Sequence, residues 1–206
     1  MINYPKISPK LPIMEIFYSI QGEGFHTGKP AIFIRLGGCD VGCVWCDVKE
    51  SWNEEDHPFY TIDEILQDIQ KFESKLVIVT GGEPLMYDLT ELTKALRSQG
   101  YKVNLETSGV YPLTGEWDWV CFSPKKFKAP HASIYPRADE LKIVAFNRSD
   151  FDFAEVHRAK VNDTCALLLQ PEWGKASQMH EQIIDYVKAN PDWNISLQTH
   201  KYLNIR

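Results

Sequence analysis

Three cysteines crowded into one short segment constrain this chain more than any other feature of its sequence. Cys39, Cys43 and Cys46 follow a C-x3-C-x2-C pattern. Thiolates are soft ligands that select zinc, copper or iron–sulfur clusters. A 4Fe–4S cluster normally takes four cysteines, so a set of three leaves one iron with an open position, which is what catalysis at a metal requires. The spacing therefore favours a 4Fe–4S cluster with one exchangeable site.

A structural zinc site is the alternative that the cysteines leave open. His26 or His57 could complete a closed zinc site with the three thiolates. Zinc sites usually use C-x2-C pairs that are well separated along the chain, whereas Cys121 and Cys165 stand alone. The ligand spacing favours the cluster, and a non-catalytic zinc-binding module remains the alternative from a different class.

The bulk composition is that of an ordinary globular protein. The chain has 206 residues with 44% hydrophobic content, which suggests one domain with a real core. A net charge of −6 gives no reason to expect affinity for nucleic acid or anionic membranes. No apolar run approaches the ~20 residues that span a bilayer, and the N-terminus lacks the apolar core of a signal peptide. Clustered cysteines do not suit a secreted disulfide framework, so we expect a cytoplasmic protein.

Strand and helix patterns alternate along most of the chain, which predicts a parallel α/β sheet. Strands are expected at 14–20, 30–36, 76–80, 101–106, 119–122, 140–144, 166–169 and 195–198, and helices from 61, at 88–98 and at 176–189. Thr61 and Glu64 have the spacing of a capping box at a helix start. About six core strands with few full helices predict an incomplete, TIM-like barrel. Residues 1–12 are interpreted as an extended arm.

Polar residues follow the ends of the predicted strands. Such positions are occupied by the cysteine loop, 80–83, 106–108, 123–125, Lys142 and Gln170. Chemistry in parallel α/β folds takes place at the carboxyl ends of the strands. The sequence therefore predicts one active site at that edge of the sheet.

The cysteine loop after one apolar strand and the GGEP turn after the next together resemble the radical S-adenosylmethionine (SAM) superfamily. That resemblance implies that Cys39, Cys43 and Cys46 hold a 4Fe–4S cluster whose open iron chelates the methionine part of SAM. One electron from the cluster would then cleave SAM to a 5′-deoxyadenosyl radical. By the same resemblance Trp45 lies near the adenine, and the turn at 81–83 receives the ammonium group of SAM.

A closer resemblance extends over nearly the whole chain, to the 7-carboxy-7-deazaguanine synthase family. It rests on the segments EIFYSIQGEG, IFIRLGGC, VTGGEP, LETSG, FSPK, DELKIV, LQPEW and LQTHKYLNIR. The resemblance implies one radical SAM domain over 1–206, which converts 6-carboxy-5,6,7,8-tetrahydropterin to 7-carboxy-7-deazaguanine and ammonia for 7-deazapurines such as queuosine. A glycyl-radical-enzyme activase is the alternative within the superfamily.

Site residues follow from the same resemblance. The residues expected to bind SAM are Trp45, Gly81, Gly82, Glu83, Ser123, Pro124, Lys125 and Gln170. Those expected to bind the substrate are Ile20, Gln21, Gly22, Glu23, Arg35, Thr80, His200 and Arg206. Arg35 would pair with the substrate carboxylate in a bidentate manner, and Glu23 would accept from the amino and ring N–H groups of the pterin.

Magnesium, partners and the chain terminus complete these expectations. The family commonly has Thr or Ser after the Cys-Asp pair as a magnesium ligand, but Val48 occupies that position and has no side-chain oxygen. The family also implies a homodimer and an electron donor such as flavodoxin or ferredoxin. Residues 199–206 are expected to close the active site, docked by Tyr202, Leu203 and Ile205, with the terminal carboxylate of Arg206 reaching the substrate.

Overall fold

The protein folds around one curved sheet, as seen in a computed structural model that describes residues 5–206. The nine strands of the described part are arranged in the order β3-β1-β2-β4-β5-β6-β7-β8-β9. They are β1 Lys10–Ile20, β2 Pro30–Leu36, β3 Phe59–Thr61, β4 Leu76–Gly81, β5 Lys102–Thr107, β6 Trp119–Phe122, β7 Glu140–Ala145, β8 Ala166–Pro171 and β9 Trp193–Ile195. From β2 to β9 every neighbouring pair is parallel, whereas β1 runs antiparallel to both β2 and β3.

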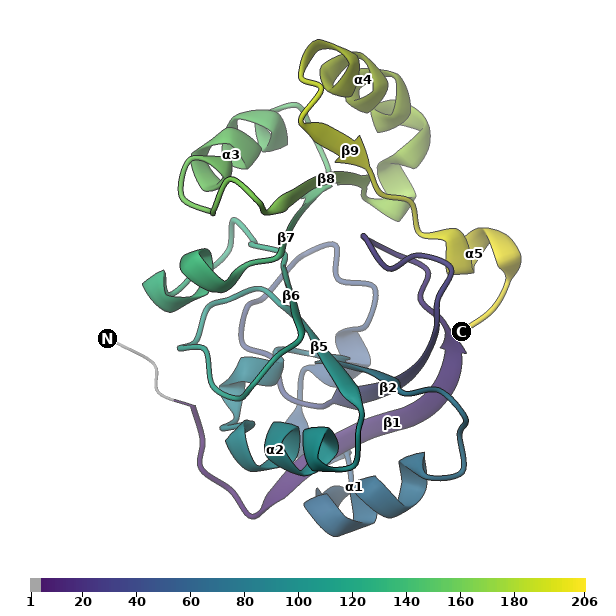
Figure 1. Cartoon of the computed structure of the whole chain (residues 1–206). Coiled ribbons are helices and arrows are strands. Elements are labelled where there is room, and N and C mark those ends of the chain that lie inside the picture. The colour runs from purple at the N-terminus through teal and green to yellow at the C-terminus, as the bar shows by residue number, and fades with distance from the viewer. Residues whose placement is uncertain (1–4) are drawn as a thin grey trace.

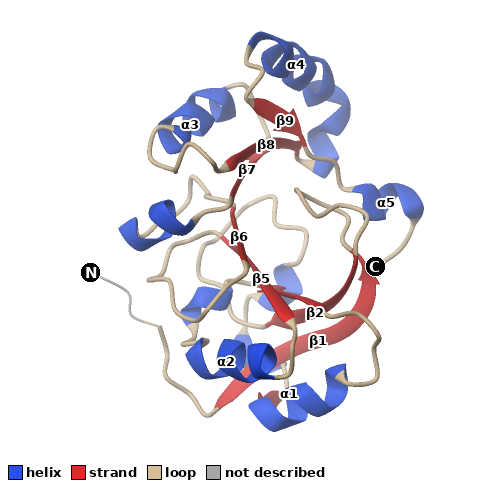
Figure 2. Cartoon of the chain, in the orientation of Figure 1, coloured by secondary structure: helices blue, strands red, loops and turns tan. Residues whose placement is uncertain are grey.

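Helices cover the outside of this sheet, and Figure 1 shows the strands curving from β1 round to β9 without closing. The helices are α1 Ile62–Ile69, α2 Thr90–Ser98, α3 Ser149–Arg158, α4 Ala176–Ala189 and α5 Thr199–Leu203. Among the covering helices, α2 packs on β5, α3 on β7, and α4 on β8 and β9. Figure 2 shows that loops rather than helices make many of the connections. The predicted partial barrel with few helices is therefore confirmed.

The sequence anticipated several helix boundaries from local chemistry. The capping box at α1 is present, because the backbone N–H of Thr61 donates to the Glu64 carboxylate at 2.7 Å and the N–H of Glu64 donates back to the Thr61 hydroxyl at 3.3 Å. Helix α4 occupies the expected range. Helix α3 was not predicted, because its buried face includes Asp150 and His157 as well as apolar residues, and this mixture obscures the helical periodicity.

The expected N-terminal arm is shorter than predicted. Residues 1–4 lie outside the described part of the chain, but Lys10–Pro12 already belong to β1, where they pair with β3. Strand β3 has only three residues, too few to produce a readable alternation. The last strand also differs from the prediction, since β9 ends at Ile195 and residues 196–198 form a connecting segment to α5.

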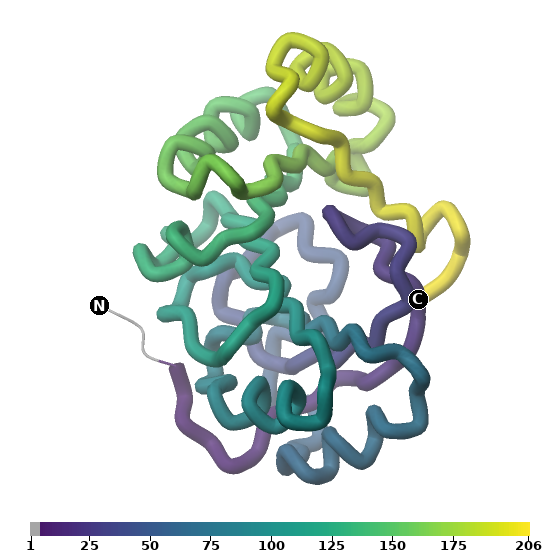
Figure 3. The backbone as a smooth tube through the Cα atoms, in the orientation of Figure 1, coloured from purple at the N-terminus to yellow at the C-terminus, as the bar shows by residue number. Residues whose placement is uncertain are grey.

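The C-terminal segment returns to the end of β1 and to the turn that follows it. Figure 3 shows the C-terminal segment running beside the early part of the chain. The N–H of Thr199 donates to the carbonyl oxygen of Gly22 at 2.8 Å. This contact closes one side of the space above the strand ends. No helix in the described residues has the length and apolar character needed to cross a bilayer.

Candidate active site

A cavity of about 530 Å³ opens where the parallel strands end. It is lined by the cysteine loop after β2, the turn after β4, and residues at or beyond the ends of β5, β6, β7 and β8. The C-terminal segment forms its remaining wall. A space of this size accommodates one or more ligands of drug-like dimensions. The single active site predicted from the strand ends therefore corresponds to a real cavity.

Cys39, Cys43 and Cys46 all line this cavity and none forms a disulfide. The backbone holds their loop in place, because the N–H of Gly38 donates to Ser51 at 2.6 Å and that of Cys39 donates to Trp52 at 3.0 Å. Burial raises the pKa of Cys39 to about 11, so cluster ligation must displace a tightly held proton. Three free thiols on one cavity wall fit a 4Fe–4S cluster with an open iron.

The two histidines proposed as additional zinc ligands lie elsewhere. His57 is 2.9 Å from the backbone carbonyl of Glu50 through Nε2, and His26 packs edge-on against Trp119. Neither lines the cavity. Within residues 5–206, no group of three His, Cys, Asp or Glu side chains is arranged to hold a single metal ion. The donor set therefore does not fit a closed zinc site.

The turn after β4 touches the cysteine loop directly, and glycine is required there. A Cβ atom at Gly82 would lie 2.8 Å from Cβ of Cys39 and would also collide with the carbonyl oxygen of Gly38. Gly81 has a φ of +143°, in the region that favours glycine. Gly81 and Gly82 both line the cavity, as predicted for a SAM-binding turn.

Glu83 lies behind the cavity wall rather than in it. Its carboxylate accepts from the N–H of Leu85 at 3.0 Å, the N–H of Ser108 at 2.8 Å and the hydroxyl of Thr107 at 2.5 Å, and the Ser108 hydroxyl donates to it as well. The side chain therefore joins the turns after β4 and β5. Gly81 and Gly82 of this turn line the cavity, whereas the carboxylate of Glu83 already accepts hydrogen bonds from protein donors.

Most of the other residues expected around SAM do line the cavity. Lys125 donates to the Ser123 hydroxyl at 2.6 Å, and its ammonium group lies 5.6 Å from the centroid of the Trp45 ring. Burial lowers the pKa of Lys125. Gln170 lines the same cavity at the end of β8, whereas Pro124 is buried and does not line it.

Arg35 reaches the cavity from β2 with part of its guanidinium group already engaged. Its Nε donates to Glu15 at 2.8 Å, and the guanidinium carbon lies 5.9 Å from the centroid of the Phe17 ring. Arg206 contacts the other oxygen of Glu15 at 2.8 Å. These contacts fix the plane of Arg35 and leave its terminal amino groups for an anion in the cavity.

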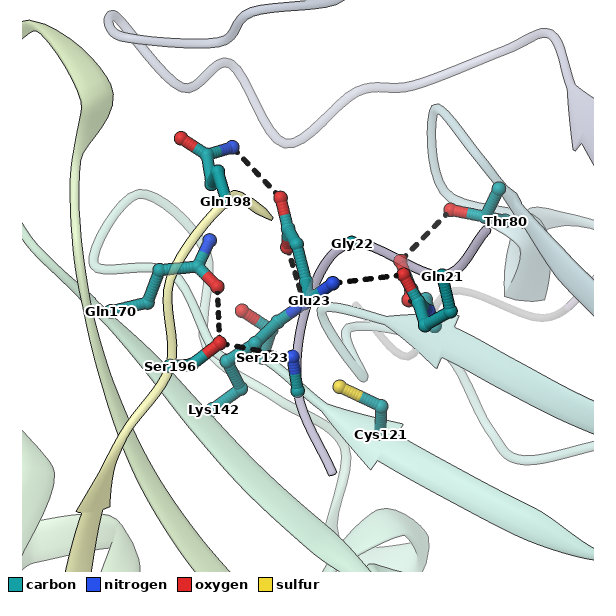
Figure 4. A network of polar contacts seen from close by, with 12 residues as sticks. Gln21, Gly22, Glu23, Thr80, Cys121, Ser123, Lys142, Gln170, Ser196 and Gln198 are labelled. Carbon is teal, nitrogen blue, oxygen red and sulfur yellow. Dashed lines mark hydrogen bonds and ion pairs between the residues drawn. The ribbon is translucent and has the colours of Figure 1, made fainter. Parts of the chain in front are cut away.

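Glu23 stands at the centre of a polar network above the sheet, shown in Figure 4. Lys142 donates to its Oε2 at 2.6 Å, and Gln198 donates to its Oε1 at 2.8 Å. Burial alone would raise the pKa of Glu23, but Lys142 and neighbouring amides lower it to about 2. Glu23 is therefore an ionised acceptor inside the cavity at neutral pH.

A second carboxylate that lines the cavity is Glu106 on β5. Glu106 accepts from Gln21 Nε2 at 2.7 Å and from the Thr80 hydroxyl at 3.4 Å. The structure thus brings Gln21 and Thr80 together on one carboxylate. Glu106 and Lys142, which were expected at this edge as polar residues at strand ends, line the cavity, and Gln198 does so as well. The sequence itself marks Lys142, because a lysine inside the apolar run of a buried strand requires a partner of opposite charge.

The C-terminal segment borders the cavity and is held by polar contacts and by one aromatic contact. Thr199 bonds to Gly22, and the Ser19 hydroxyl donates to a terminal carboxylate oxygen of Arg206 at 2.6 Å. Tyr202 and Leu203 are 57% and 63% exposed, but the Tyr202 ring packs edge-on against Trp173 at a centroid distance of 5.2 Å. Of the apolar anchors expected, Tyr202 therefore makes a contact, and hydrogen bonds and the Arg206–Glu15 ion pair also hold the tail.

His200 lies directly against Gly22. A Cβ atom at Gly22 would approach Cβ of His200 to 2.6 Å. Ile20, Gly22, His200 and Arg206 all line the cavity, as does Val48. Val48 offers only a backbone oxygen, and its carbonyl already accepts from the Ser51 hydroxyl at 2.7 Å.

Comparisons with known proteins show which family the chain is similar to. Residues 33–120 match the model of the radical SAM superfamily. A 7-carboxy-7-deazaguanine synthase from Flavobacterium psychrophilum is 57% identical over 195 residues, which cover 95% of this chain and 92% of that protein. A synthase of the same name from Synechocystis is 50% identical, with coverage of 95% and 93%.

The chain belongs to the 7-carboxy-7-deazaguanine synthase family. A crystal structure of QueE from Escherichia coli has the same fold, with a TM-score of 0.85 and 31% identity over 93% of this chain and 95% of that one. Family membership brings with it the radical SAM cofactors, a 4Fe–4S cluster and SAM.

Proposed function

We propose that this protein converts 6-carboxy-5,6,7,8-tetrahydropterin to 7-carboxy-7-deazaguanine with loss of ammonia, in the biosynthesis of queuosine-type 7-deazapurines. One observation carries the proposal: the cavity presents three free thiols together with Arg35 and with the carboxylates of Glu23 and Glu106, among others. The thiols suit a cluster, and the remaining groups match a ligand that has a carboxylate at one end and several N–H donors at the other.

The cofactors bind at the cavity wall that is formed by the cysteine loop and the strand ends beside it. Cys39, Cys43 and Cys46 hold the 4Fe–4S cluster, which with bound SAM supplies the hydrogen-abstracting adenosyl radical. The backbone of Gly81 and Gly82 receives the ammonium group of SAM, since carbonyl oxygens suit a cationic amine. The remaining SAM contacts are assigned to Trp45, Ser123, Lys125 and Gln170.

Substrate binding falls to the opposite wall. Arg35 pairs with the carboxylate of the pterin, because a guanidinium fork matches two carboxylate oxygens. Glu23 and Glu106 accept N–H donors of the ring and its amino group. Thr80 and His200 border the same space. The docked C-terminal segment excludes water, which protects a reactive radical from solvent.

We also propose a role for magnesium, an electron donor and an assembly state. Magnesium contributes little in this chain because Val48 supplies no side-chain oxygen and the carboxylate of Asp47 is paired with Lys201 at 2.9 Å. A flavodoxin or ferredoxin delivers the electron, the protein acts as a homodimer, and it works in the cytoplasm.

An anaerobic turnover assay tests the proposed function. The reconstituted protein is incubated with reductant, SAM and 6-carboxy-5,6,7,8-tetrahydropterin, and products are followed by mass spectrometry. The proposal predicts 7-carboxy-7-deazaguanine and ammonia in equal amounts. Cleavage of SAM without formation of a deazapurine would overturn it.

A further inference from the structure

Lys142 is a buried cation that has no role in the proposed binding of SAM or of the pterin. It lies on β7, its side chain is only 5% exposed, and its ammonium group is 2.6 Å from Oε2 of Glu23. A charge taken out of water costs several kcal/mol unless a partner compensates it. Its position inside a strand at the base of the cavity therefore implies a specific partner, and Glu23 is the carboxylate in contact with it (Figure 4).

Other charged and titratable groups surround this pair without replacing Lys142. The groups that face the Lys142–Glu23 pair are Glu106 on β5, Cys121 on β6 and Lys125 after β6, together with Glu140, which lies on β7 with Lys142. Lys125 is directed to the Ser123 hydroxyl instead. In the described part of the chain, Lys142 is the one cation that forms an ion pair with Glu23.

The pair fixes both the charge and the direction of the Glu23 carboxylate. Lys142 occupies one oxygen and Gln198 the other, which leaves a single orientation. An ionised carboxylate offers about four lone-pair sites, so two bonds to protein leave acceptor capacity toward the cavity. Burial lowers the pKa of Lys142 but its anionic neighbours, Glu23 first, raise the pKa well above its usual value.

We propose that Lys142 is a positioning residue for substrate binding, which keeps Glu23 ionised and aimed so that it accepts adjacent N–H donors of a planar heterocyclic substrate. This inference rests on the proposed function for the identity of the substrate. It assigns Lys142 no contact with the reacting atoms. Its effect passes through Glu23 alone, which makes the two residues separable by experiment.

Lys142→Met tests the proposal, because methionine keeps an unbranched side chain and removes the charge. Without the lysine, only the hydrogen bonds from Gln198 and Gln170 oppose the effect of burial on Glu23, so the pKa of its carboxyl rises. The carboxyl is then protonated at low pH and loses its acceptor role, and it ionises again as the pH rises. The substrate affinity of the variant should therefore approach that of the wild type as the pH increases.

Two readouts follow this change in the reconstituted protein. Infrared difference spectroscopy with labelled glutamate reports the protonated carboxyl, assigned by its absence in Glu23→Gln. Fluorescence titration with 6-carboxypterin, an oxidised analogue, reports affinity between about pH 5 and about pH 9, a range that spans the ordinary values for Glu and His. Comparing variant with wild type at each pH cancels the ionisation of the ligand itself.

The proposal predicts that Lys142→Met weakens analogue binding about tenfold for each pH unit below the new pKa of Glu23. The double variant Lys142→Met/Glu23→Gln should bind weakly with no such pH dependence. Lys126→Met is the matched control, because that lysine is paired with Asp150 and does not line the cavity. It should match the wild type at every pH.

A relative affinity for Lys142→Met that stays constant with pH would overturn the proposal, as would a double variant that retains the pH dependence. Absence of a protonated Glu23 band in Lys142→Met would overturn it without any reference to substrate. Failure of the wild type to bind 6-carboxypterin would instead count against the proposed function, and the infrared titration would still decide whether Lys142 controls Glu23.

Discussion

The guanidinium group of Arg35 has two edges, one that contacts the protein and one that is available to a ligand. The Nε edge is held by Glu15, while the outer edge faces the cavity. Glu15 also contacts Arg206, so the same carboxylate orients the predicted anion-binding arginine and fastens the tail. A sequence pattern identified Arg35 but not Glu15, because nothing local to β1 marks Glu15 as its partner.

Arg35→Ala should weaken binding of 6-carboxypterin by on the order of 2 kcal/mol, because a charge-assisted pair is lost from a mostly buried wall. The cluster should be unaffected, since Arg35 does not contact the cysteine loop. Arg35→Lys should restore little, because an ammonium group cannot form two parallel bonds. Fluorescence titration measures the affinity, and iron analysis measures the cluster.

Arg97→Ala is the matched control for that experiment. Arg97 forms surface ion pairs with Glu116 and Asp118 and does not line the cavity. If Arg35→Ala bound the carboxypterin as tightly as Arg97→Ala does, Arg35 would have no place in the substrate site.

Strands with nearly continuous burial were predictable, and irregular elements were not. β2 was recognised with its observed bounds and β4 to within one residue, because apolar runs of six or seven residues are typical of parallel strands. β3 and α3 were missed, the first because it is short and the second because its buried face is partly polar. Burial of such elements depends on distant partners, which a local pattern does not contain.

Gly82→Ala tests the contact between two loops that meet from different strands. The added methyl group would collide with the backbone of Gly38 and with Cys39, neither of which can easily move. We expect a loss of stability on the order of 1–3 kcal/mol from overpacking, together with lower iron content after reconstitution. Thermal unfolding and iron analysis measure the two effects.

Gly174→Ala provides the comparison, because a Cβ atom there would lie 3.4 Å from the nearest atom, a carboxylate oxygen of Glu172. That variant should retain iron and stability. Equal iron retention by both variants would show that the turn after β4 does not shape the cluster loop.

At the scale of the whole molecule, the chain closes on itself through its C-terminal segment. The Ser19 hydroxyl and Glu15 on β1 hold Arg206, and Gly22 holds Thr199. The sequence indicated that this segment would dock through apolar side chains, but it did not indicate the polar anchors, because hydrogen bonds to backbone groups leave no mark in a hydrophobicity pattern. Glu106 and Lys142 were expected near the site as polar residues at strand ends, but their contacts with Gln21 and Glu23 were not, because these arise only when separate elements converge.

Deletion of Ile205 and Arg206 should strongly reduce turnover while the cluster still assembles. The deletion removes the ion pair to Glu15 and opens the wall that covers the cavity. Leu203→Ala should have little effect, because that side chain is mostly exposed. Turnover and iron content are measured for both. Wild-type turnover in the deletion variant would show that the tail is not part of the site.

The electron paramagnetic resonance spectrum of the reduced protein tests the central claim most directly, namely that Cys39, Cys43 and Cys46 hold a 4Fe–4S cluster whose open iron faces the shared cavity. We predict a reduced-cluster signal in the wild type that shifts when SAM is added. Replacement of any one of the three cysteines by Ala should abolish or sharply reduce the signal. A signal of wild-type intensity and SAM response in all three variants would contradict the account.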